Sequence, residues 1–127
     1  MSRSGSVGIV AVVPADVDGF AFGSFQIKFR LRKEVANPFF IAYILNSPLG
    51  RHQVEQQKTG SIQMNITIEG IKALNVPLPP LSLQKQLVEE SDQMRAQILN
   101  LRAESEQIIQ NAKLQVDHML LNKEVYT

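Results

Sequence analysis

The spacing of apolar and polar residues divides the chain at a proline-rich stretch near residue 77. Before it, short apolar runs alternate with turns that contain glycine or proline. After it, residues 82–122 contain neither glycine nor proline, and apolar side chains recur every three or four positions. The first pattern is typical of short strands and helices, and the second of one continuous helix. We therefore predict a small body followed by a long C-terminal helix.

Strands are predicted in several parts of the body. Residues 9–13 form an apolar run after a glycine turn, and residues 74–76 form another before the prolines. In residues 20–31, one face holds Phe25, Ile27, Phe29 and Leu31, and the other holds Gln26, Lys28, Arg30 and Arg32. This period-two alternation indicates one or two strands. Apolar and polar side chains also alternate in residues 61–66, and this stretch is expected to form a short strand or loop.

Two short helices are predicted between these strands. Asn37 is a good N-cap because it precedes Pro38 and an apolar run, and the helix ends near Ser47. A second helix is expected over residues 49–58, and one helical turn precedes residue 74. The predicted fold class is therefore α+β, with a small mixed α/β body. The phenylalanines are expected in its core: Phe20, Phe22, Phe25, Phe29, Phe39 and Phe40.

The long helix is expected over residues 82–123, with Ser82 as its N-cap. Its apolar side chains are spaced alternately by four and three residues, which is the heptad pattern of a coiled coil. The predicted helix-pairing residues are Leu87, Met94, Ile98, Leu101, Ile108, Ala112 and Met119. Because a single helix about 60 Å long cannot bury this stripe on so small a body, we expect a partner helix. The prolines at 77, 79 and 80 stiffen the connector, residues 76–81, between the domain at residues 1–80 and the helix.

Composition and charge exclude several classes of protein. The chain has no cysteine, which excludes disulfides and thiolate metal sites and is compatible with a reducing, cytoplasmic location. The apolar run at residues 8–13 is too short to span a membrane. His52 and His118 have no companion at ligand spacing, and no phosphate-binding glycine loop is present. We therefore expect a non-enzyme with no metal and no cofactor.

The charge is unevenly distributed along the chain. Residues 1–80 carry eight Lys or Arg and five acidic residues, whereas residues 81–127 carry five and seven. A mildly basic body on a mildly acidic helix is typical of a polyanion-binding domain carried on a protein-binding helix.

Three groups of side chains have the chemistry to contact nucleic acid. The first group consists of cations that suit phosphate contact: Lys28, Arg30 and Arg32, followed by Lys33. A solvated outer face of a sheet would show the same alternation of charged side chains. The stretch from 58 to 65 combines a cation, hydroxyls and amides that can reach base edges, or that form an ordinary exposed strand face. Its candidate DNA-binding residues are Lys58, Thr59, Ser61, Gln63 and Asn65. Arg3, Ser4 and Ser6 form a third candidate group.

Four motifs occur in an order that resembles one protein family. They are Ser-Gly-Ser-Val-Gly at residues 4–8, Asn-Pro-Phe-Phe-Ile-Ala-Tyr-Ile-Leu-Asn-Ser at 37–47, Gly-Ser-Ile-Gln-Met-Asn-Ile at 60–66, and Val-Pro-Leu-Pro-Pro-Leu-Ser-Leu-Gln-Lys-Gln-Leu at 76–87. Followed by a long heptad helix, this order resembles the specificity (S) subunit of type I restriction-modification systems. By this resemblance, the chain corresponds to the C-terminal half of a target recognition domain and the conserved spacer helix that follows it.

The resemblance implies a non-catalytic component that recognises double-stranded DNA. It implies that the long helix pairs with another helix, in a homodimer or with a second helical segment, sets the spacing of two half-sites and docks methyltransferase subunits. The partners it implies are the modification and restriction subunits of a DNA restriction complex. Two alternatives remain open from the residues alone: a coiled-coil protein-assembly adaptor, and the C-terminal recognition domain of a fused restriction-methyltransferase enzyme.

Overall fold

A computed structural model of the chain describes residues 1–61 and 63–123. Its helices are η1 (Ala15–Val17), α1 (Pro38–Asn46), α2 (Pro48–Gln57), α3 (Ile68–Lys72) and α4 (Leu81–Lys123). The chain divides into two compact units, Met1–Val88 and Glu89–Thr127. We call the first unit the body; it includes the first two turns of α4. The second unit contains the remainder of that helix.

The predicted α+β class is wrong, because the described residues contain helices but no strand and no sheet. Among the described residues, the segments expected to be strands form no ladder; isolated bridges pair Ser2 with Gln26, Ser4 with Asn65, and Thr59 with Asn65. A strand requires successive backbone hydrogen bonds to a neighbouring segment, and side-chain alternation does not specify that neighbour.

Side-chain amides take the place of a neighbouring strand at two of these segments. Asn46 accepts from the Val10 N–H at 3.0 Å and donates to the Val10 carbonyl at 2.8 Å. Gln53 makes the same pair of bonds with Asn75, at 2.7 and 3.0 Å. Each amide satisfies both backbone groups of one residue, so the segment stays extended without a sheet.

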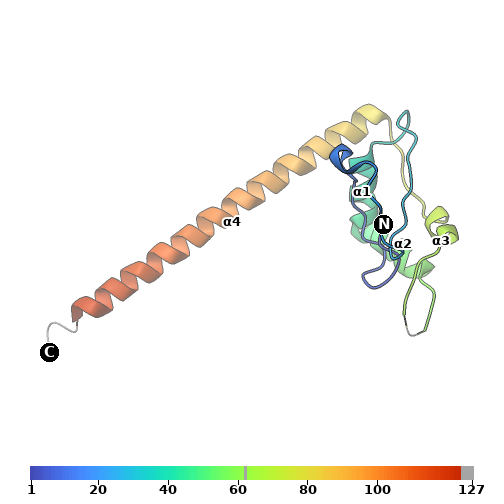
Figure 1. The fold of residues 1–127 in the computed structure, drawn as a ribbon. Coiled ribbons are helices and arrows are strands. Elements are labelled where there is room, and N and C mark those ends of the chain that lie inside the picture. The colour runs from blue at the N-terminus through green and yellow to red at the C-terminus, as the bar shows by residue number, and fades with distance from the viewer. Residues whose placement is uncertain (62, 124–127) are drawn as a thin grey trace. The chain divides into compact units, whose positions relative to one another are not determined.

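The helix α1 forms at the predicted position and carries most of the core. The Asn37 side chain accepts from the backbone N–H groups of Phe39 and Phe40, which confirms it as the N-cap, with Pro38 at the first helical position. The buried residues of α1 join Val10, Ala36 and Val88 in one cluster; those residues are Phe40, Ile41, Ala42 and Leu45. The adjoining helix α2 packs against α1 and α3 (Figure 1).

A second, smaller cluster lies under the first residues of the chain. It consists of Val7, Val54 and Ile66, which come from the N-terminal turn, α2 and the segment before α3. Gly50 allows α1 and α2 to meet closely, since a Cβ there would lie 2.3 Å from the Ile44 carbonyl oxygen.

The expectation that all phenylalanines are buried is wrong. Phe40 is buried and Phe29 packs partly against the core, but Phe20, Phe22 and Phe25 are 76%, 54% and 65% exposed. Phe39 is 52% exposed because it lies on the outer side of α1. The body at residues 1–88 has a small core, and α1 already fills most of it.

The long helix α4 begins one residue earlier than predicted. Leu81 is its first residue, so Ser82 lies inside the first turn and is not the N-cap. The carbonyl of Pro80 accepts from the Gln84 N–H at 3.1 Å, which starts the helical bonding directly after the prolines. Across residues 1–61 and 63–123, each helix is either too short or too polar to cross a membrane.

Candidate nucleic-acid interface

The cationic face predicted from period-two alternation is present without a strand. From residue 26 to residue 32, exposed and partly buried side chains alternate. Phe29 and Leu31 pack against the main core, whereas Lys28, Arg30 and Arg32 are exposed. Because alternate side chains of an extended chain point to opposite sides, the three cations face away from the core.

The loop from residue 59 to residue 65 is closed by its own backbone. Thr59 and Asn65 exchange two backbone hydrogen bonds of 2.9 Å each. Gly60 has a φ of 111°, and a Cβ there would lie 2.4 Å from the Gln63 carbonyl oxygen, so glycine is required at this turn. Thr59, Ser61 and Gln63 are exposed, while Asn65 is half-buried and donates from Nδ2 to the Gln63 carbonyl at 2.9 Å. Exposed hydroxyls and amides therefore stand beside the backbone bonds that join Thr59 and Asn65; residue 62 lies outside the described residues.

Lys58 differs from the other predicted cations. Its Nζ pairs with Oε1 of Glu55, one turn earlier, and its side chain is only 14% exposed. Its charge already has a partner at the end of α2. The prediction that it contacts DNA requires that pair to open or to be shared with a phosphate.

The N-terminal residues connect the cationic segment to this loop. Arg3 donates its backbone N–H to the Phe25 carbonyl at 2.7 Å, and its own carbonyl accepts from the Ile66 N–H at 3.1 Å. Bridges on either side of Arg3 pair residues from all three segments: Ser2 with Gln26, and Ser4 with Asn65. Candidate residues that are about thirty positions apart in sequence are thus held in neighbouring backbone segments.

The turn that contains Ser4 and Ser6 is fixed on α2. Gly8 has a φ of 85° and lies directly over Val54, where an added Cβ would come within 2.4 Å of the valine Cγ1. The Arg51 guanidinium donates to the Val7 carbonyl at 3.1 Å. Ser6 is exposed at the surface of this turn, so the third candidate group is held beside the loop by core contacts.

A hollow lies next to the N-terminal residues on the body. It is lined by Arg3, Ile27, Thr67, Ile68 and Glu69. An arginine and a glutamate therefore border the same hollow, whose lining also includes two isoleucines. Sequence reasoning did not single out Glu69, because its position beside Arg3 depends on the fold.

The amino group of Met1 is held at the cationic segment. Burial lowers the pKa of the Met1 amino group, which donates to the Ile27 carbonyl at 3.0 Å. Among the described residues, no group of three or more histidine, aspartate or glutamate side chains is placed to hold a metal ion.

Gln84 is a structural residue of this unit that the sequence did not reveal. Its side chain is fully buried, accepts from the Asn37 N–H at 2.8 Å, and donates to the carbonyls of Val35 and Pro79 at 2.8 and 2.7 Å. It therefore joins the start of α1, the proline connector and the first turn of α4. A signal was available: Gln84 stands four residues before Val88, so both share the helix face that meets the core.

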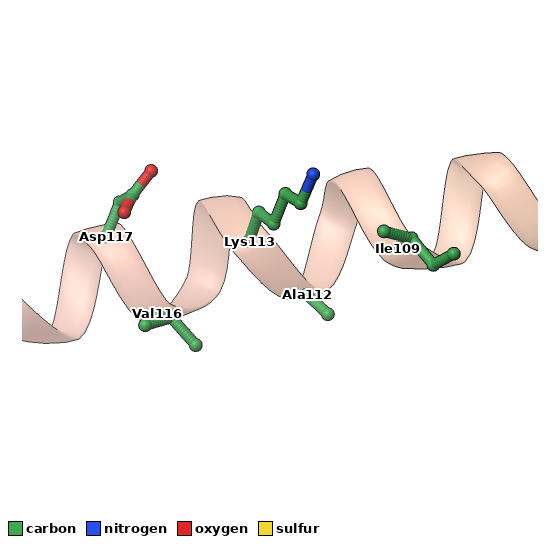
Figure 2. Close-up of a pocket in the computed structure, with 5 residues that line it drawn as sticks. All are labelled: Ile109, Ala112, Lys113, Val116 and Asp117. Atoms are coloured by element: carbon green, nitrogen blue, oxygen red, sulfur yellow. The ribbon is translucent and has the colours of Figure 1, made fainter.

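The helix α4 exposes a long apolar surface. Six of the seven predicted helix-pairing residues are large and are 41–67% exposed, namely Leu87, Met94, Ile98, Leu101, Ile108 and Met119. Ala112 is also exposed and borders a shallow hollow with Ile109, Lys113, Val116 and Asp117 (Figure 2). All five of these residues belong to one helix, so this hollow is an open space between side chains.

Comparisons with known proteins identify the family. A family model described as the type I restriction modification DNA specificity domain matches residues 1–110. The chain is 33% identical over 93 residues to the type I restriction enzyme EcoKI specificity subunit of Escherichia coli strain K12. It is 31% identical, over an equal length, to the StySPI specificity subunit of Salmonella potsdam.

Each of these two matches covers 73% of this chain and 20% of the relative, so the matched region spans about a fifth of either subunit. No solved structure matches the chain significantly. Because the family model covers most of the residues, the chain belongs to the family of type I restriction-modification DNA specificity domains.

Proposed function

We propose that this chain recognises a specific DNA sequence as part of the specificity subunit of a type I restriction-modification system. The family supports this function in general, and one structural observation carries it for this chain. The backbone bonds of Arg3 hold the cationic segment and the loop at 59–65 in adjacent positions on the body. Cations beside hydroxyls and amides are the combination that DNA recognition requires.

The two groups have different roles in this proposal. Lys28, Arg30 and Arg32 bind phosphates, because they are exposed and make no ion pair with any described residue. Phosphate contacts position the body and make its affinity depend on salt. The polar side chains of the loop, and Lys58 once released from Glu55, contact base edges or the adjoining backbone. These loop residues are Thr59, Ser61, Gln63 and Asn65.

The long helix has a separate, non-catalytic role. Its exposed apolar side chains bind a second long helix, either from another copy of the chain in a homodimer or from another part of the specificity subunit. This pairing sets the spacing between two DNA half-sites and provides the surface on which methyltransferase and restriction subunits assemble. The apolar exposure along α4 supports a protein partner, since such a stripe is costly to leave in water.

A titration with duplex DNA of mixed sequence at several salt concentrations tests the DNA-binding function. The logarithm of affinity should fall linearly with the logarithm of salt concentration. Removing one phosphate contact, as in Arg30→Ala, should reduce the magnitude of that slope by about 0.9. Lys113→Ala, which removes the same charge from α4, is the control and should leave the slope unchanged. Absence of binding even at low salt would refute the proposal.

One observation favours a second function, that of a protein-assembly adaptor. Phe20, Phe22 and Phe25 are each exposed on the body, and aromatic side chains are enriched in protein interfaces. The same titration separates the two functions, because an adaptor predicts no salt-dependent DNA binding. A fused enzyme has no such support in the structure.

A further inference from the structure

We propose that the hollow between Arg3 and Glu69 reads a G·C base pair. This inference rests on the proposed DNA-binding function and assigns a specific contact within it. The hollow is lined by one cation, one anion, the Thr67 side of the α3 N-terminus and two isoleucines. It lies next to Ser4 and Asn65 through the hydrogen bond from the Ile66 N–H to the Arg3 carbonyl.

The arginine side of the hollow suits guanine. Arg3 is exposed at its side chain, but its backbone is held on both sides, by Phe25 at 2.7 Å and Ile66 at 3.1 Å. A fixed backbone limits the positions that the guanidinium can occupy. The planar guanidinium donates two parallel hydrogen bonds to guanine O6 and N7, which is the commonest specific contact in the major groove.

The glutamate side suits the cytosine of the same pair. Glu69 stands in the first turn of α3, whose start is fixed by the bond from the Gly70 N–H to the Thr67 hydroxyl at 3.0 Å. A carboxylate accepts from the cytosine N4 amino group and is repelled by phosphates. A carboxylate at a DNA-binding surface therefore lowers affinity unless it meets a base donor.

The two charged groups are available to a ligand. No ion pair or side-chain hydrogen bond joins Arg3 or Glu69 to another residue of the described chain. Ile27 and Ile68 supply the apolar part of the lining. Apolar walls exclude water from an occupied hollow, which strengthens hydrogen bonds made inside it.

The experiment is selection of preferred duplexes from a randomised library by the full chain, followed by affinity measurements on the selected and a scrambled duplex. Arg3→Lys keeps the charge but loses the paired donors. Glu69→Gln keeps the shape but loses the charge. We expect each variant to lose about 5- to 150-fold in affinity for the selected duplex at one G·C position, with little loss for the scrambled duplex. Glu34→Gln, an exposed acid outside the hollow, is the matched control and should keep the preference.

The sign of the Glu69→Gln effect decides the outcome. If Glu69 is only a bystander anion, its removal reduces repulsion and raises affinity for both duplexes equally, which would overturn the inference. If Arg3→Lys loses affinity equally for both duplexes, Arg3 contacts a phosphate and not a base, which would also overturn the inference. A wild-type chain that binds all duplexes equally would refute base reading at this hollow while leaving phosphate binding intact. A chain that binds none would refute the proposed function itself.

Discussion

Replacing Gln84 with alanine should loosen the attachment of α4 to the body. The change removes three buried hydrogen bonds and leaves the Asn37 N–H and the carbonyls of Val35 and Pro79 without their partner. A typical hydrogen bond contributes about 0.5–1.5 kcal/mol net, and an unsatisfied buried group costs about 1–3 kcal/mol. Allowing for water entering part of the site, we expect a loss of about 3 kcal/mol, which far exceeds the small gain in helix propensity.

Hydrogen exchange measured by mass spectrometry suits this test, because it reports each part of the chain separately. Amides in residues 35–42 and 81–88 should lose about 100-fold in protection, whereas the rest of α4 should change little. Gln93→Ala, an exposed glutamine of the same helix, is the control. If the amides of residues 35–42 and 81–88 exchange equally fast in the Gln84→Ala and Gln93→Ala variants, Gln84 does not hold the junction and the reasoning is wrong.

A charged replacement tests the directions of the same bonds. In Gln84→Glu the carboxylate still accepts from the Asn37 N–H but faces two carbonyl oxygens. Burial and those oxygens favour the protonated acid, so the pKa of this carboxyl rises on folding. The variant should therefore be most stable at a pH below the ordinary glutamate pKa, and should lose stability as pH rises through the raised value. A stability that increases with pH over this window would contradict the assigned donor and acceptor roles.

Three further predictions concern the loop, the core and the helix. Gly60→Ala should strain the loop by about 1–3 kcal/mol and weaken DNA binding, as measured by titration. Gly23→Ala is the control: an added Cβ there meets open space, so DNA binding should not change. Asn46→Ala should cost about 1–3 kcal/mol in denaturant unfolding, because it leaves two backbone groups of an extended segment without partners; an unchanged midpoint would show that water replaces the amide. Ile108→Asp should abolish association seen by light scattering, whereas Leu114→Asp, about 120° around the helix from it, should leave the mass unchanged if one stripe pairs.

Local patterns in the sequence predicted the helices well. The cap at Asn37 and the absence of breakers after Pro80 depend on neighbouring residues only, so α1 and α4 lie close to their predicted positions. The alternation at residues 26–32 likewise predicted which side chains face outward. The strands were wrong because the partner of an extended segment is chosen by the fold. Asn46 and Gln53 took that role, and an amide side chain carries no sequence signal for it.

The candidate site shows the same division between local and tertiary information. The sequence by itself determined the chemistry: which cations are spaced to share a face, which loop carries hydroxyls and amides, and the apolar stripe along the helix. Only the tertiary structure decided that Arg3 lies between Phe25 and Ile66, that Glu69 borders the same hollow, and that Lys58 is already paired. The physical reason is the separation along the chain of the residues that interact. Caps and side-chain periodicity depend on residues a few positions apart. The contacts of Arg3 and Glu69 join distant segments, whose approach depends on the packing of the whole body.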